Sequence, residues 1–359
     1  MRNTSFFLSL LLGAFAGEAV AQAWTGGGTN NNWSTGANWS GGAAPPSAAT
    51  TAISFGPAVR FSPVVDTPWT INRIDFSTGG YSFTGQPITF AGVNPRVVVG
   101  INQSPIVISN PVVLTGAMVV SNFGFLDFTG GISGTGPITF AGGPGFSGLR
   151  GASTFTGGAT VTPGHVLSLQ GGSMSGPVTV NDAGILGGGG TISGPVSVNG
   201  GPGGGLVPSV AHGTMRVGNL TNSASLRLTI SGTAQGIQYS HVDVTGTVNL
   251  ASPLLVLAGS FVPTAGTVFT IITNDGTDPV VGTFASLPEG ATVMFNGVPL
   301  TISYVGGTGN DVTLTAGAPL VAAAQTPTLS HLALLLLAAL LPWIGATQLR
   351  RRSIPHKRG

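Results

Sequence analysis

Short runs of alternating apolar and polar residues, bounded by Gly, Asn and Pro, recur from residue 53 to residue 314. Gln86-Pro-Ile-Thr-Phe90 and Gly176-Pro-Val-Thr-Val180 are two examples. Because successive side chains of a strand point to opposite faces, the alternation predicts strands with a buried apolar face and an exposed Ser/Thr face. Pro stands at the start of each run, where a strand ladder tolerates a residue without an N–H.

Several of these runs are near copies of one another, which indicates an internal repeat. They begin at Gln86, Asn110, Gly136, Gly176 and Gly194, in steps of 24, 26, 40 and 18 residues. We interpret most steps as single turns of about 20 residues, and the step of 40 as two turns. Such a period is typical of a solenoid, in which each turn packs against its neighbours. The sequence therefore predicts an all-β fold, a right-handed parallel β-helix, with a β-sandwich as the alternative.

The composition agrees with a secreted, turn-rich β protein. The 359 residues include 59 Gly and 25 Pro, and only 6% are charged, against about 25% in a typical soluble domain. Gly has no three-residue period, which excludes collagen, and the 42% hydrophobic content argues against disorder. With no Cys, a disulfide scaffold and a thiolate metal site are both excluded.

The basic isoelectric point of 9.5 arises from the C-terminal tail. Five of the twelve basic residues lie in the last ten positions, whereas the central part has six Arg against nine acidic residues. The charge therefore does not indicate a nucleic-acid partner.

The N-terminus has the pattern of a secretory signal peptide. Arg2 precedes an apolar run over residues 6–16, and Ala19 and Ala21 form a small-residue cleavage site. We expect residues 1–21 to be removed by signal peptidase, with cleavage after Ala23 as an alternative. An uncleaved anchor is disfavoured because the apolar run is short.

The C-terminus has the pattern of a membrane anchor. Residues 329–349 are apolar and long enough to form one transmembrane helix, in which a Pro is tolerated. Arg350, Arg351 and Arg352 follow directly, and the positive-inside rule places the tail, residues 350–359, in the cytoplasm. The body would then lie outside the inner membrane.

A sorting motif precedes this span, at the end of a linker over residues 317–328. Thr326, Pro327, Thr328, Leu329 and Ser330, followed by the apolar span and the Arg cluster, resemble the IPTL-CTERM family of bacterial sorting signals, relatives of the PEP-CTERM tails. The resemblance implies processing by an exosortase-type membrane protease near the Pro-Thr-Leu motif. The chain departs from the family in having Thr326 where Ile is usual and His331-Leu332 in place of Glu-Trp. A plain membrane anchor is the alternative.

Residues 147–316 resemble the autotransporter-associated β-strand repeat and its closing module. The motifs that carry this resemblance are Thr154–Val161, Val166–Leu169, Gly184–Gly194, Val217–Leu220, Val242–Val248, Gly266–Ile272, Gly282–Gly290 and Ile302–Asp311. Residues 22–146 would form an N-terminal cap and degenerate turns of the β-helix. The Trp24, Trp33 and Trp39 region is also common at the mature start of such proteins. The resemblance implies a surface-exposed or secreted β-helix without known activity.

Candidate catalytic groups are sparse. Glycoside hydrolysis needs two carboxylates about 5–9.5 Å apart, and the sequence has no Asp-x-Asp pair. Asp275 and Asp278 share one loop and are interpreted as turn residues. His241 and Asp243 would point to the same face of a strand, with Ser240 on the opposite face, and are interpreted as solvated strand residues.

Candidates for a metal or a sugar site are equally few in the sequence. His165 and His212 lie in Gly-rich turns without a second ligand at metal-binding spacing. Residues 306–314 resemble a calcium-binding nonapeptide, but the single copy favours a closing hairpin turn. The three N-terminal Trp residues are interpreted as a cap on the open end of the solenoid rather than a sugar-stacking platform.

The sequence as a whole predicts an exported, non-catalytic, adhesin-like structural protein of the bacterial cell surface or extracellular matrix. No cofactor is expected. The expected partners are signal peptidase, an exosortase-type protease, the membrane through the C-terminal helix, and a surface glycan or host ligand of unknown identity. The alternative is a polysaccharide-binding or polysaccharide-cleaving β-helix protein.

Overall fold

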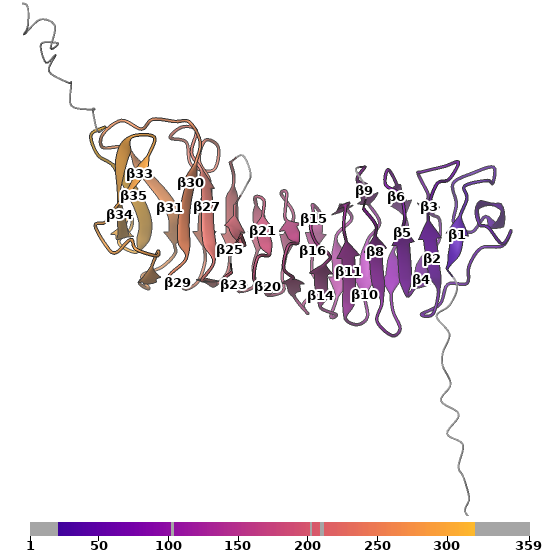
Figure 1. Cartoon of the computed structure of the whole chain (residues 1–359). Helices are drawn as coiled ribbons and strands as arrows, with labels where there is room; N and C mark the ends of the chain where they lie inside the picture. Colours follow the sequence, from indigo (N-terminus) through magenta and orange to yellow (C-terminus); the bar gives the residue numbers. More distant parts are fainter. Residues whose placement is uncertain (1–20, 102–103, 202, 209–211, 320–359) are drawn as a thin grey trace, which may run out of the picture. The chain divides into compact units, whose positions relative to one another are not determined.

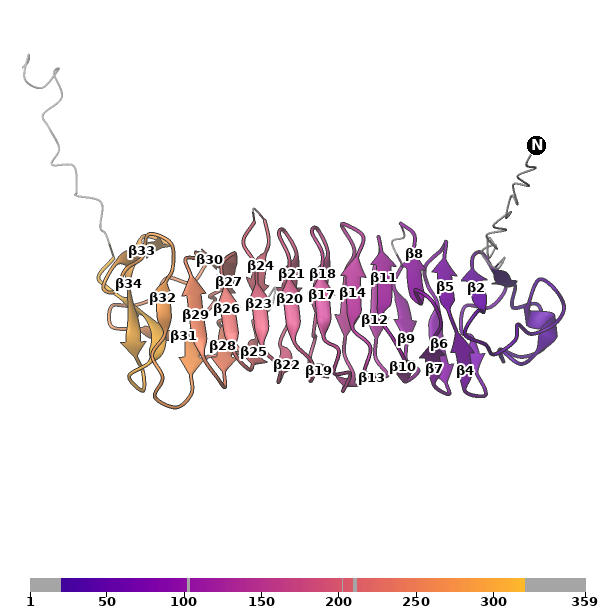
Figure 2. The same ribbon diagram turned by 90° about the horizontal axis from the view of Figure 1, so that it is seen from below.

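The computed structural model describes residues 21–101, 104–201, 203–208 and 212–319. Within these residues the regular structure is β-strand, apart from one 3-10 turn, η1 (Gly36–Asn38). The described residues up to Ala318 form one compact unit. Its turns stack along a single axis (Figures 1 and 2). One end is β1 (Gln22–Trp24), and the other is formed by β33 (Thr292–Phe295), β34 (Val298–Gly306) and β35 (Asp311–Ala316). The predicted parallel β-solenoid is confirmed, and the β-sandwich alternative is wrong because successive turns pair in parallel.

Three strands in each turn contribute to three faces of the solenoid. Over the described residues, the first face is a 12-stranded sheet: β1 (Gln22–Trp24), β2 (Ala52–Phe55), β5 (Arg73–Phe76), β8 (Arg96–Val99), β11 (Met118–Asn122), β14 (Ile138–Ala141), β17 (Ala159–Val161), β20 (Val178–Val180), β23 (Val196–Val198), β26 (Leu220–Asn222), β29 (Val248–Ala251) and β32 (Val281–Thr283). The second face, in the same described residues, is a 10-stranded sheet: β3 (Val64–Val65), β6 (Ser82–Gly85), β9 (Ile106–Ile108), β12 (Phe125–Phe128), β15 (Phe146–Leu149), β18 (Val166–Ser168), β21 (Ile185–Gly187), β24 (Gly205–Val207), β27 (Ser225–Thr229) and β30 (Leu254–Ala258).

Over the part of the chain that the structure describes, the third face consists of two sheets. They count as one face because β13 (Ile132–Gly134), the last strand of the first sheet, contacts β16 (Ala152–Ser153), the first strand of the second. The first sheet is β4 (Trp69–Ile71), β7 (Ile88–Phe90), β10 (Val112–Leu114) and β13 (Ile132–Gly134). The second sheet is β16 (Ala152–Ser153), β19 (Ser173–Met174), β22 (Gly190–Ile192), β25 (Thr214–Val217), β28 (His241–Val244), β31 (Val268–Asn274), β35 (Asp311–Ala316), β34 (Val298–Gly306) and β33 (Thr292–Phe295).

The near-copied runs do not all lie on the same face. The copies beginning at Gln86 and Asn110 form β7 and β10 on the third face, whereas those beginning at Gly136, Gly176 and Gly194 form β14, β20 and β23 on the first face. The step of 26 residues is therefore one turn plus one further face, and our interpretation of it as a single turn is wrong. The other steps are as predicted. The repeated motif marks entry into a strand after a corner, and it does not specify which face the strand joins.

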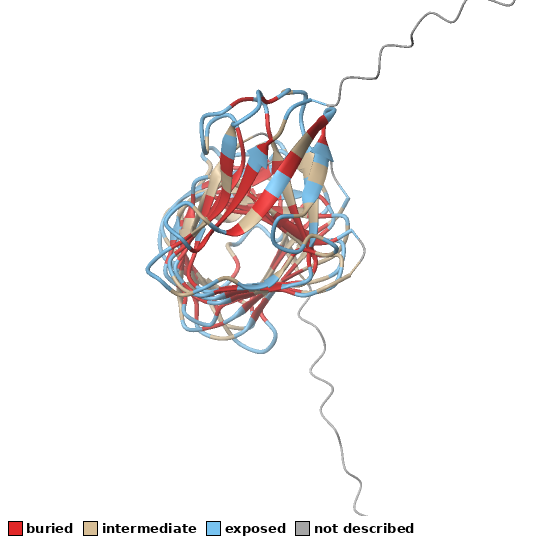
Figure 3. Ribbon diagram, turned by 90° about the vertical axis from the view of Figure 1, so that its left-hand side faces the viewer, coloured by how far each residue is buried: buried red, intermediate tan, exposed pale blue. Residues whose placement is uncertain are grey.

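Stacked apolar side chains form the core. Within the repeated runs Ile88, Phe90, Val178 and Val180 are buried as the alternation predicts. Along the first face the inward residues form a continuous row: Ile53, Ile74, Val97, Val120, Phe140, Val161, Val180 and Val198. Figure 3, a view along the solenoid, shows buried residues lining the inside of the turns and exposed residues outside. Each such side chain stabilises the fold by roughly 1.5–3 kcal/mol relative to exposure.

Both ends of the stack are closed by non-repeating structure. At the N-terminal end Trp24, Trp33 and Trp39 are buried against one another and against Phe55, with ring centroids 5.3–6.2 Å apart. The Trp39 indole N–H donates to the Trp33 carbonyl at 2.7 Å. The prediction that these Trp residues cap the solenoid is confirmed.

At the C-terminal end the pairing changes from parallel to antiparallel. Strand β31 pairs with β35, β35 with β34, and β34 with β33, all antiparallel. These strands lie across the end of the stack where the next parallel turn would otherwise continue (Figure 1). Edge pairing of this kind removes the unpaired N–H and C=O groups that an open solenoid would expose.

The topogenic segments are largely outside the described residues. Ala19, the motif Thr326–Ser330, the span over residues 329–349 and the Arg350–Arg352 cluster all lie there, and so these predictions stay open. Within the described residues no helix has the length and apolar character needed to cross a membrane. The sequence-based division between residues 146 and 147 falls inside strand β15, so the two sections share a strand.

Candidate functional site

The second face carries a groove, built from residues that the structure describes. It runs across strands β12 to β27, and we call it the lateral groove. Its lining is Pro105, Phe125, Asp127, Phe146, Arg150, Val166, Ser168, Gln170, Ile185, Gly187, Gly188, Gly189, Val207 and Arg227. Two adjoining hollows of about 450 and 390 Å³ share Phe146 and Gln170.

Parallel register between turns builds this groove. In each strand the first and third residues face outward, so like positions line up along the axis. The first positions form an apolar row, Phe125, Phe146, Val166 and Ile185. The third positions, Gly148, Ser168 and Gly187, form a row of small residues beside it. Because the row of small residues has little side-chain volume, it forms the floor of the groove, and the apolar row forms one wall.

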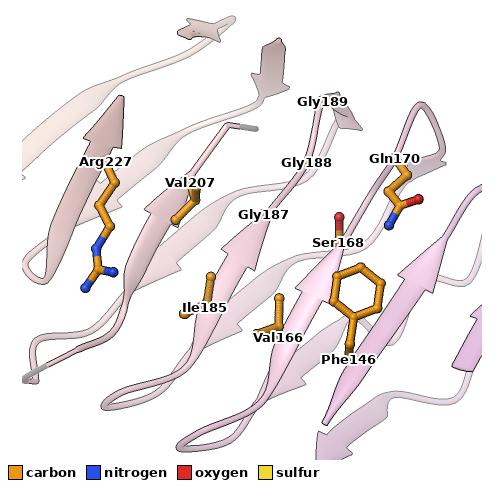
Figure 4. A pocket seen from close by; sticks show the side chains of 10 residues that line it. All are labelled: Phe146, Val166, Ser168, Gln170, Ile185, Gly187, Gly188, Gly189, Val207 and Arg227. Carbon is orange, nitrogen blue, oxygen red and sulfur yellow. The ribbon is translucent and has the colours of Figure 1, made fainter. Parts of the chain in front are cut away.

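Figure 4 shows the larger hollow, with Phe146 and Arg227 at opposite ends and Val166, Ile185 and Val207 between them. Phe125 and Phe146 lie side by side, with ring centroids 6.1 Å apart. With neighbouring strands about 4.8 Å apart, the five strand steps from β12 to β27 make the groove about 24 Å long.

The two ends of the groove carry charge. At the β12 end the Arg150 guanidinium donates twice to Asp127 Oδ2, from Nε and Nη2, each at 3.2 Å. Asp127 Oδ1 is buried without a hydrogen-bond partner, directly beside Gly148, where a Cβ would lie 1.9 Å from it. At the other end Arg227 Nη2 donates to the Gly203 carbonyl at 3.2 Å.

The prediction that His241 is a solvated strand residue is wrong. It is 3% exposed, and its Nε2 lies 2.8 Å from Thr273 Oγ1. Burial lowers the pKa of His241 to about 4, opposed by the Asp243 carboxylate and assisted by Arg216. Asp243 pairs instead with Arg216 at 3.1 Å. His241 and Asp243 were expected on the same face of the strand, but they do not form a hydrogen bond with each other.

Ser240 is also buried and has a structural role. Its Oγ accepts from the Thr229 backbone N–H at 3.1 Å. Ser240, His241 and Asp243 thus each bond to a different partner, and they do not form a nucleophile–base–acid relay.

His165 lies in a buried polar corner between the first and second faces. Its Nδ1 contacts the Gly142 carbonyl at 2.8 Å, and its Nε2 contacts Ser147 Oγ at 3.0 Å. Asn122 Nδ2 also donates to Ser147 Oγ, at 3.2 Å. Burial lowers the pKa of His165, so the imidazole is neutral: Nδ1–H donates and Nε2 accepts. His212 lies apart, with its Nε2 2.6 Å from Ser231 Oγ.

The acidic residues of the closing region hold turns. Residues 306–311 form the hairpin turn between β34 and β35, as favoured from the sequence. Asp311 accepts from the Asn274 N–H at 2.9 Å and the Thr308 N–H at 3.0 Å. In the loop of Asp275 and Asp278, the backbone carbonyls of both accept from Asn310.

Sequence reasoning missed the lateral groove. Its signal was present as Gly148, Ser168 and Gly187 at steps of 20 and 19 residues, beside Phe146, Val166 and Ile185 at the same steps.

Within the described residues no three His, Cys, Asp or Glu side chains are placed to hold a metal ion. No protein-family model, no curated protein and no solved structure matches this chain.

Proposed function

We propose that this protein is an exported, non-catalytic structural protein of the cell surface or extracellular matrix, with an adhesin-like role. The observation that carries the proposal is a solenoid closed at both ends. The Trp cluster covers one end and the antiparallel strands β31–β35 cover the other, while the stacked turns between them present long lateral faces. Such a unit is suited to hold a lateral surface away from its point of attachment.

Export through a cleaved signal peptide is supported by the position of the first strand. Strand β1 begins at Gln22 and pairs in parallel with β2 through Gln22, Ala23 and Trp24. Cleavage after Ala21 keeps this strand whole, whereas cleavage after Ala23 would remove two of its three residues. We therefore prefer Ala21.

The proposal extends to the C-terminal tail. Residues 329–349 would form a membrane helix, and an exosortase-type protease would process the chain near Pro327. The right-handed sense of the β-helix belongs to the same proposal, since crossovers between parallel strands of one sheet are right-handed in nearly all proteins.

A second candidate function is polysaccharide binding. The lateral groove favours it, because an elongated apolar surface bordered by Gln170, Arg150 and Arg227 combines faces for stacking with polar edges. Polysaccharide cleavage has less support. The groove offers one carboxylate, Asp127, and both hydrogen bonds of its Oδ2 come from Arg150.

Surface display and adhesion can be tested on intact cells. We expect antibodies against the solenoid to label unpermeabilised bacteria, and a strain lacking this protein to lose at least half of its attachment to surfaces. A strain expressing the chain without residues 329–359 serves as the control, and should release the solenoid into the medium. Labelling only after permeabilisation would contradict the proposal.

A further inference from the structure

Arg227 is the cation of the lateral groove that has no carboxylate partner among the described residues. The Arg150 guanidinium bonds to Asp127, and Arg216, on the third face, bonds to Asp243. The one hydrogen bond of the Arg227 guanidinium within the described residues goes to the Gly203 carbonyl. Because a guanidinium has five N–H donors in a planar fork, Arg227 retains donors for a bidentate anion.

The groove wall is matched to a flat ligand with one apolar side. Phe146, Val166 and Ile185 form a continuous apolar strip, and Phe125 extends it with 45% of its surface exposed. Ser168 lies in the floor beside this strip, and Gln170 lines the same hollow. A pyranose ring has a face of C–H groups and a rim of hydroxyls, so a sugar chain satisfies both sides at once.

A peptide fits this surface less well. The strands under the groove, β18, β21 and β24, are each paired on both edges. No strand edge is therefore open there for an added peptide strand, which would need main-chain hydrogen bonds. Recognition must come from side chains and ring faces, as in sugar binding.

We propose that the lateral groove binds an extended acidic glycan, one whose sugar units carry carboxylates. A carboxylate bonds to the Arg227 guanidinium, and the adjoining sugar rings lie on Ile185, Val166 and Phe146. Arg150 at the other end is neutralised by its ion pair with Asp127, so the carboxylate of the ligand is recognised at Arg227. This proposal rests on the second candidate function, polysaccharide binding, and specifies its ligand class.

Titration calorimetry of the full chain in detergent micelles tests the proposal. The probes are oligomers of polygalacturonate and of alginate, with methyl-esterified polygalacturonate as the neutral match and cellohexaose as an unrelated neutral glycan. We expect at least one of the acidic oligomers to bind, the ester to bind at least tenfold more weakly, and raised salt to weaken binding. Arg227→Gln should lower affinity at least tenfold, Arg227→Lys less, and the matched control Arg216→Gln should leave it unchanged.

The remaining outcomes separate this proposal from the function on which it rests. Equal binding of acid and ester, lost in Phe146→Ala, would overturn carboxylate recognition while leaving polysaccharide binding intact. If none of the glycans binds, both the acidic ligand and the polysaccharide function fail. Binding that survives both Arg227→Gln and Phe146→Ala would place the site elsewhere. Circular dichroism of each variant shows whether it keeps the β-fold.

Discussion

Replacement of Gly134 by alanine is expected to destabilise the protein by about 3 kcal/mol, the upper end of the range for a residue forced into a disfavoured backbone conformation. Gly134 has a φ of +108°, and a Cβ on it would lie 2.1 Å from the carbonyl oxygen of Leu114. These two residues are neighbours because β13 and β10 belong to successive turns. The substitution thus tests both the positive φ at Gly134 and the close approach of the two turns.

Gly116 provides the matched control for this substitution. It lies at the corner after β10, its φ is not positive, and a Cβ on it would meet no atom within 4 Å. Gly116→Ala should therefore leave stability unchanged or raise it slightly, because alanine narrows the unfolded ensemble. Urea unfolding followed by circular dichroism measures both variants. Equal midpoints for Gly134→Ala and Gly116→Ala would contradict both the positive φ and the close approach.

Acidification is expected to destabilise the protein by about 3 kcal/mol through His241 alone. The pKa of this side chain is about 4 in the folded protein and 6.5 in the unfolded chain, because burial disfavours the charged imidazole. The unfolded chain therefore takes up a proton first. Stability is greatest above pH 6.5 and falls as the pH drops towards 4, where the loss levels off. His165, whose pKa is also lowered, acts in the same direction.

Urea unfolding between pH 4 and pH 8 measures this dependence. His241→Asn removes the titrating group, so its stability should fall less steeply below pH 6.5 than that of the unaltered protein. Val242→Ala is the control, since Val242 is buried beside it and carries no charge. The free energy of unfolding of Val242→Ala should be lower than that of the unaltered protein at every pH, and its slope against pH should be the same. An unchanged slope in His241→Asn would show that the histidine does not control acid stability.

The side chains that face the core could be predicted from the sequence, because they are marked by a period of two residues within a single strand. The alternation at Ile88 and Phe90, and at Val178 and Val180, predicted their burial without knowledge of the neighbouring turns. The Trp cap was predictable for a similar reason. Large apolar residues among Gly and Asn at the start of a solenoid have an open end of core to cover.

The arrangement of the outward-facing side chains depends on which residues of adjacent turns are aligned. The sequence does not show this alignment directly. Aligned residues are 19 apart between Val161 and Val180, 24 apart between Val198 and Asn222, and 32 apart between Leu250 and Gly282. With turns of such unequal length, reading a fixed period displaces outward residues from their true neighbours.

This irregularity concealed the burial of His241, whereas the lateral groove was missed because its signal is spread over three turns, at steps of 20 and 19 residues. The groove needs three small residues from three turns to line up. His241 contacts Thr273, which lies 32 residues later in the sequence, on the strand where parallel pairing changes to antiparallel pairing. Neither arrangement has a local sequence pattern.

Mass spectrometry of the protein from separated inner-membrane, surface and culture-medium fractions of the native bacterium tests the central claim most directly. An exported and processed surface solenoid predicts a chain that begins at Gln22, ends near Pro327 and is recovered from the surface or the medium. A chain that still carries Leu332 to Arg358 and remains in the inner membrane would contradict C-terminal sorting. A chain in the cytoplasm that retains residues 1–21 would contradict export altogether.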